Sequence, residues 1–207
     1  RVKLLYGQGQ YHYSGAMTSS FDFTTRAAAA MTAQRNLHAA FREVTHRNDD
    51  QHLATRRWTA LLAENQRKFI DTFPGGFDHA WEKVARGDLT DLNNLVAYLE
   101  ADPWHFRSGY FKELIARRLG KITLERDVAD RLIVVIERRL REGPSTFEFK
   151  QYVRLGGKLA RARLIGVALE LWNSVDHKTA FRARDALMRL DNPQWRDLWF
   201  NMQAKRN

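Results

Sequence analysis

Residues 106–142 read FRSGYFKELIARRLGKITLERDVADRLIVVIERRLRE, and the fold follows from this stretch. Apolar side chains recur in it every three or four residues, the spacing that places them on one face of an α-helix. These positions are Phe106, Tyr110, Phe111, Leu114, Ile115 and Leu119, then Val128, Leu132, Val135, Ile136 and Leu140. Gly120 interrupts the pattern, and Thr123 follows as a candidate helix cap. The stretch therefore predicts two antiparallel helices joined by a tight turn.

The same arrangement is expected twice more toward the C-terminus. Gly143 and Pro144 end the second helix of the first pair. A further pair is predicted at about 146–155 and 158–173, divided at Gly156 and Gly157, and a last pair at about 178–190 and 193–204. The pairs begin near residues 106, 146 and 178, which is the scale of stacked helical hairpins.

The N-terminal half is predicted to hold four more helices after a non-helical arm. Residues 1–23 intersperse glycine with glutamine and tyrosine, a composition typical of turns and extended chain. Helices are expected at about 24–47, with Thr24 or Thr25 as its cap, and at about 51–72, 77–86 and 90–101. No stretch after residue 24 alternates like a strand, so the fold class is all-α. We divide the chain into the arm 1–23, an N-terminal helical region 24–104, and a basic C-terminal helical-repeat region 105–207 continuous with it.

In layout, the chain resembles the HEAT-like and armadillo-like helical repeat families over roughly residues 77–204. The resemblance rests on helix lengths, tight turns, and the motifs Asp102-Pro103-Trp104 and Asp191-Asn192-Pro193 at unit boundaries. It implies stacked antiparallel hairpins that present a long preformed binding surface. A globular helical bundle shares these features and stays open as the alternative architecture.

Several kinds of chemistry find no support in the sequence. The chain has no cysteine, so disulfides, thiolate metal sites and a cysteine nucleophile are excluded. Its seven histidines form no ligand pair at helical spacing, and no phosphate-binding glycine loop occurs, so we expect no metal and no cofactor. The longest clean apolar run is Leu132–Ile136, too short for a membrane span. These features predict a soluble, cytoplasmic protein without a recognisable catalytic motif.

The positive charge of the chain is concentrated in its second half. Residues 1–100 carry 12 Lys/Arg and 11 Asp/Glu, whereas residues 101–207 carry 22 and 13. Such an imbalance attracts acidic partners. We therefore expect a non-enzymatic scaffold that binds an acidic protein, with nucleic acid as the alternative partner. The candidate residues are Arg107, Arg117, Arg118, Lys121, Arg138, Arg141, Arg154, Lys158 and Arg161.

Two interpretations of these cations remain open. If the second helices of the pairs line a concave face, Arg138, Arg141, Lys158 and Arg161 would form a basic track for phosphates. Alternatively, they belong to a solvated face laced with Glu137, Glu142, Glu148 and Glu170. A surplus of this size makes complete cancellation by those acids improbable, which favours a partner-binding surface.

A local cluster at residues 104–110 has two interpretations as well. His105 and Arg107 precede a helix N-terminus, a place that attracts phosphate or carboxylate groups. The favoured interpretation is structural: Trp104, Phe106 and Tyr110 pack in the core, and Arg107 pairs with Asp102 or a neighbouring acid.

Two further hypotheses concern the chain ends. The basic helical layout is similar to that of HEAT-like DNA glycosylases, whose sites use Trp, Asp and Arg. Those residue types are supplied, without a diagnostic spacing, by Trp195, Arg196, Asp197 and Trp199, or by Trp172 and Asp185. The N-terminal arm 1–23 is a candidate for self-association, because its exposed aromatic and glycine-rich chain is suited to docking on a second protomer or on the repeat body.

Overall fold

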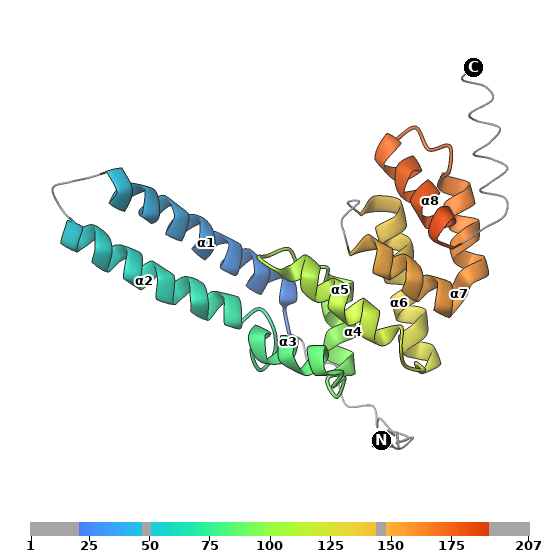
Figure 1. Ribbon diagram of the computed structural model, residues 1–207, viewed down its shortest axis with the longest axis horizontal. Coiled ribbons are helices and arrows are strands. Elements are labelled where there is room, and N and C mark those ends of the chain that lie inside the picture. Colours follow the sequence, from blue (N-terminus) through green and yellow to red (C-terminus); the bar gives the residue numbers. More distant parts are fainter. Residues whose placement is uncertain (1–20, 47–50, 144–147, 191–207) are drawn as a thin grey trace, which may run out of the picture.

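The computed structural model describes residues 21–46, 51–143 and 148–190, and within these ranges every regular element is a helix (Figure 1). The elements are α1 (Phe23–His46), α2 (Gln51–Ile70), α3 (Phe77–Arg86), α4 (Leu92–Ala101), α5 (Ser108–Leu119), α6 (Arg126–Glu142), α7 (Phe149–Leu171) and α8 (His177–Arg189). The all-α prediction is thus confirmed. In the described part of the chain, no helix is both long and apolar enough to cross a lipid bilayer.

The first two helices form a long hairpin that extends away from the remaining helices (Figure 1). Small side chains line its seam on α1, where Ala27, Ala30, Ala33 and Ala40 are all buried. Because alanine has only a methyl group, the two helix backbones can approach closely. Among its described residues, large side chains such as Trp58, Leu61 and Leu62 are only partly buried, and the hairpin depends on contacts at its base for attachment to the body.

Aromatic rings make that attachment. Phe23 begins α1, Phe73 follows α2, and both pack against Tyr98 of α4 with ring centroids 5.4 and 5.7 Å away. Phe77 of α3 and Phe111 of α5 complete the cluster, with their centroids 5.0 Å apart. All five side chains are almost fully buried. The base of the hairpin and the start of the body therefore share one core.

The remaining helices stack in two rows. Helices α3, α5 and α7 contact one another in order, and so do α4, α6 and α8. Two contacts show that α5 and the first half of α7 run parallel: Gln151 donates to Glu113, and Lys158 donates to Gly120, each pair 38 residues apart. From α3 to α8, each helix thus packs beside the helix two positions along the chain. Successive helical hairpins are therefore stacked on one another.

Helix α7 corrects the division predicted at Gly156 and Gly157. Both glycines are helical, and the bend lies at Ala160, where φ is −153° and ψ is 55°. A Cβ atom on Gly156 would lie 2.7 Å from the Leu164 side chain and 3.1 Å from that of Ile136. Gly156 therefore permits a close approach across the bend and does not form the turn itself.

Other boundaries shift by a few residues. The first helix is capped by Asp22, whose Oδ1 accepts a hydrogen bond from the Thr25 amide at 2.9 Å, in place of the predicted threonine cap. The α6 helix starts at Arg126, three residues beyond Thr123. The predicted helix at 193–204, the arm up to residue 20 and the residues from Trp195 to Trp199 lie outside the described residues.

Candidate functional site

Several of the predicted partner-binding cations bind the ends of helices in their own chain. Arg118 of α5 donates to the carbonyl of Ala85 at the end of α3. Arg138 of α6 donates to the carbonyl of Glu100 at the end of α4. Lys158 of α7 reaches the carbonyls of Gly120 at 3.0 Å and Ile122 at 2.8 Å after α5.

The series continues in α8. Arg182, which is buried, donates to the carbonyls of Leu140 and Arg141 at 3.0 and 2.6 Å. A cation at a helix C-terminus satisfies carbonyls that lack intrahelical partners and compensates the negative end of the helix dipole. Part of the basic surplus thus stabilises the stack, because each of these cations ties one helix to the helix two positions earlier.

Two more candidates also have intramolecular partners. Arg141 forms two hydrogen bonds with the Glu170 carboxylate, both at 2.9 Å. Arg161 donates to the carbonyl of Leu190 after α8. The four residues of the predicted phosphate track, Arg138, Arg141, Lys158 and Arg161, therefore all contact their own chain.

Besides Arg107, three of the predicted residues keep exposed side chains for which the described part of the chain supplies no hydrogen bond or ion pair: Arg117, Lys121 and Arg154. Their positions are set by the parallel pairing of α5 and α7. Lys150 contacts Glu113 at 3.6 Å, and Lys158 binds carbonyls on either side of Lys121. Between these two fixed points, Arg154 lies level with Arg117.

These residues form two short rows. Arg117 and Lys121 are four residues apart on or just after α5, and Arg154 and Lys158 are four residues apart on α7. All four are exposed. We call these four the α5–α7 basic ridge. The structure thus brings together four of the nine predicted cations, but on the row of α5 and α7 and with only Lys158 from the predicted track.

The aromatic cluster at residues 104–110 differs from the predicted core packing. Trp104, Phe106 and Tyr110 are 73%, 59% and 58% exposed. The core position is taken by His105, which is buried. The neighbouring interior is already filled by the Phe77 and Phe111 rings. The space left there holds the His105 ring, and the three aromatic rings of the loop stay outside.

His105 is held neutral by its environment. Its Nδ1 lies 2.9 Å from the carbonyl of Phe106, an acceptor, so Nδ1 carries the proton. Nε2 then accepts from the Tyr98 hydroxyl at 2.8 Å. Burial lowers the pKa of His105 to about 4. A neutral, buried imidazole does not attract an anion, which removes His105 from the predicted anion site.

Arg107 does not pair with Asp102. That carboxylate instead binds two buried cations, Lys112 at 2.6 Å and Arg139 at 2.6 Å. Arg139 also contacts the buried carboxylate of Glu148 at 3.2 Å. Burial lowers the pKa of Lys112, while Asp102 opposes that shift. The cluster joins α4, α5, α6 and the start of α7, and its charges balance one another, as buried ion pairs require.

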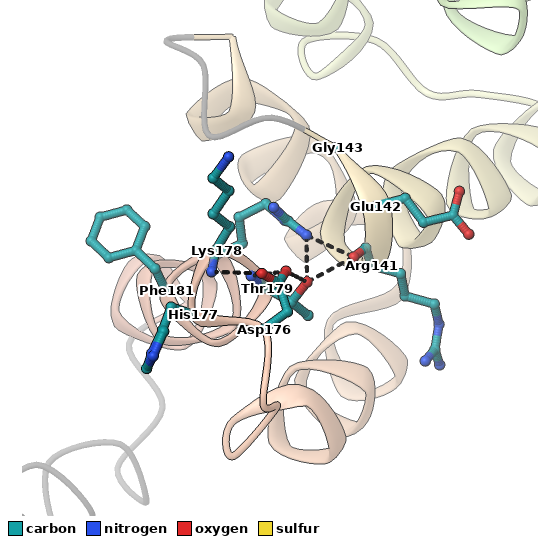
Figure 2. A pocket seen from close by; sticks show the side chains of 9 residues that line it. Arg141, Glu142, Gly143, Asp176, His177, Lys178, Thr179 and Phe181 are labelled. Atoms are coloured by element: carbon teal, nitrogen blue, oxygen red, sulfur yellow. Dashed lines mark hydrogen bonds between the residues drawn. The ribbon is translucent and has the colours of Figure 1, made fainter.

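A cavity of about 690 Å³ lies between the end of α6 and the start of α8 (Figure 2). Its polar centre is internally satisfied: Asp176 caps α8 by accepting from the amides of Lys178 and Thr179 at 3.3 and 2.9 Å. Figure 2 shows Arg141, Glu142 and Lys178 extending away from this centre. Because its charged groups diverge, the cavity lacks the convergent polar groups of a ligand site.

No group of side chains suited to holding a metal ion occurs within residues 21–46, 51–143 and 148–190. The sequence carried one signal for the helix-end contacts that was missed: Arg118, Arg138 and Lys158 recur at intervals of 20 residues. Comparisons with protein-family models, curated proteins and solved structures find no match to this chain.

Proposed function

We propose that this chain is a HEAT-like helical-repeat binding module whose α5–α7 basic ridge binds an acidic protein partner without catalysing a reaction. The supporting observation is that Arg117, Lys121 and Arg154 stay exposed and without a partner in the described chain, whereas most cations around them are bound internally. A surface cation without a carboxylate can gain an ion pair on binding without breaking one. The ridge is a place where several cations of the basic surplus are gathered and available to another molecule.

The spacing of the ridge matches a helical partner. Arg117 and Lys121 are one turn apart, as are Arg154 and Lys158, so charges in each row are about 6 Å apart along the helix axis. An acidic helix with a carboxylate at every fourth residue has the same spacing of about 6 Å between its charges along the helix axis. Single exposed ion pairs contribute about 0–1 kcal/mol, so affinity would come from several acting together and from faster encounter.

The test is binding of the full chain to two labelled probes, a helical peptide with Glu at every fourth residue and a 20-base-pair DNA duplex. We expect the acidic peptide to bind. Arg154→Glu should weaken this binding about tenfold, because the substitution removes an attraction to the peptide carboxylates and adds a repulsion. Lys178→Glu is the matched control, because Lys178 is also exposed and its side chain has no partner among the described residues, but it lies on α8. It should alter binding less than twofold.

Equal losses for Arg154→Glu and Lys178→Glu would reject the ridge, because only overall charge would then matter. Tighter binding of the duplex, with log affinity falling against log salt at a slope near −4, would instead identify four phosphate contacts and favour a nucleic acid. Failure of the peptide to bind at about 50 mM salt, where exposed charges are least screened, would reject an acidic partner for this surface.

A further inference from the structure

The loop that precedes α5 places aromatic side chains at the surface. Trp104, Phe106 and Tyr110 all have more than half of their surface exposed. Trp81 of α3 is half-buried beside them and contacts the same arginine as Phe106. Tryptophan, tyrosine and arginine supply most of the binding energy at protein interfaces, and exposed apolar patches mark such sites. We call residues 104–110 the aromatic loop.

Arg107 lies at the centre of the aromatic loop. Its guanidinium carbon is 5.7 Å from the Trp81 ring centroid and 5.9 Å from that of Phe106. No carboxylate in the described ranges pairs with it. Stacking orients a guanidinium while leaving the N–H groups at its edge free for a carboxylate. The side chain is thus preorganised to bind an acid.

The backbone of Arg107 supports a role beyond folding. Its φ is +67°, in the left-handed region that glycine or asparagine adopts more readily than arginine. A position that needs only this backbone shape would be better served by glycine. An arginine at this φ adds backbone strain that glycine would avoid, and strained residues cluster at binding sites, which supports a use for its side chain.

A small cavity adjoins the aromatic loop. It measures about 230 Å³ and lies between α1, α2 and the ring of Phe106, whose centroid is 6.2 Å from that of Phe69. The lining residues are Ala30, Gln34, Leu37, His38, Asn65, Gln66, Phe69 and Phe106. None of them is acidic. The volume is below the roughly 300–1,000 Å³ of small-molecule sites, so it suits one large side chain, and the walls made by Leu37, Phe69 and Phe106 favour an apolar one.

We propose that an acidic peptide segment docks on the aromatic loop, with one large apolar side chain in the cavity beside Phe106 and a neighbouring carboxylate on Arg107. Charge complementarity selects this partner, because the only charged group stacked in the loop is a cation and the cavity lining has no acid. The site lies at the start of α5, and the basic ridge lies about 18 Å away at its end. The proposal for the aromatic loop can therefore be tested independently of the ridge.

The test uses a ten-residue peptide rich in Asp and Glu with one central Phe, and its counterpart with Ala at that position. We expect the Phe peptide to bind the full chain at least tenfold more tightly than the Ala peptide. Leu37→Trp, which fills the cavity from its wall, should abolish that difference. Equal binding of both peptides to the unaltered protein would overturn the proposal.

Arg107→Gly separates binding from folding. Glycine adopts a φ of +67° without strain, so the variant should keep or slightly raise the melting temperature. We expect it to weaken binding of the Phe peptide at least fivefold, whereas Arg154→Ala on the ridge should leave the tenfold preference for the Phe peptide over the Ala peptide unchanged. Unchanged affinity in Arg107→Gly would assign Arg107 a structural role and overturn the proposal. So would a dimer in sedimentation that dissociates in Trp104→Ser, because a second copy would then occupy the loop.

Discussion

At the scale of single residues, the least expected feature is the polar interior of this basic protein. Asp102, with a φ of 47°, ends α4 and connects Lys112 to Arg139. Close to this ion pair in the sequence, the Tyr98 hydroxyl forms a hydrogen bond with Nε2 of His105. Each side chain named here has a partner of complementary chemistry, which is the condition for burying it, whereas the buried Oε2 of Glu148 has none in the described chain. The two networks therefore specify how α4, α5 and α6 meet.

The neutrality of His105 predicts a pH dependence of stability. Its pKa is about 4 in the folded chain against about 6.5 in the unfolded chain, so the unfolded chain binds a proton first as pH falls. Stability is therefore complete above pH 6.5 and is lost as pH falls toward 4. We expect the free energy of unfolding, measured in urea, to fall between pH 7 and 4.5 in both proteins. The fall should be about 2 kcal/mol smaller in His105→Gln than in the unaltered chain. Parallel pH profiles for the two proteins would contradict a neutral, buried His105.

At the scale of elements, α7 shows how a glycine that is predicted to form a turn can serve packing instead. Gly156 and Gly166 are both helical, and a sequence pattern treats them alike. Their surroundings differ, because Gly156 is buried against Leu164 and Ile136, whereas an added Cβ on Gly166 would meet nothing within 4 Å. The bend at Ala160 brings Leu164 back toward Gly156.

The two glycines form a matched pair for substitution. Gly156→Ala should destabilise the fold by about 1–3 kcal/mol, because the buried Leu164 side chain has little room to move. Gly166→Ala should stabilise it by about 0.5–1 kcal/mol, because alanine loses less backbone entropy in an exposed helix. Chemical denaturation of both variants measures the difference. Equal effects would show that the approach across the bend is not close.

At the scale of the whole molecule, the hairpin and the stacked body differ in how their helices are supported. The distal part of α1 and α2, as far as the structure describes it, extends away from the other helices (Figure 1), and Phe41 and Leu53 are 53% and 65% exposed there. Helix α6 instead contacts α4, α7 and α8. Local opening requires less free energy where fewer buried contacts are lost.

We therefore expect amide hydrogen exchange to be fastest in the distal part of the hairpin and slowest in α5 and α6. Peptide-resolved exchange, followed by mass spectrometry at pH 7, measures this gradient. The base of the hairpin, where Phe23 and Phe73 are buried, should exchange at rates between the two extremes. Uniform protection from α1 to α8 would indicate that the molecule opens as one cooperative unit, contrary to this expectation.

The sequence by itself determined the all-α class, the order of the helices and the surplus of positive charge. Helix signals act over a few residues, so the predicted helix at 77–86 coincides with α3. Tertiary structure alone decided which cations are available, because Lys158 meets carbonyls 36 and 38 residues away and Arg182 meets one 42 residues away. It also decided that His105 is buried and Trp104 exposed, since neighbours in sequence become core or surface only when distant helices occupy one side of the loop.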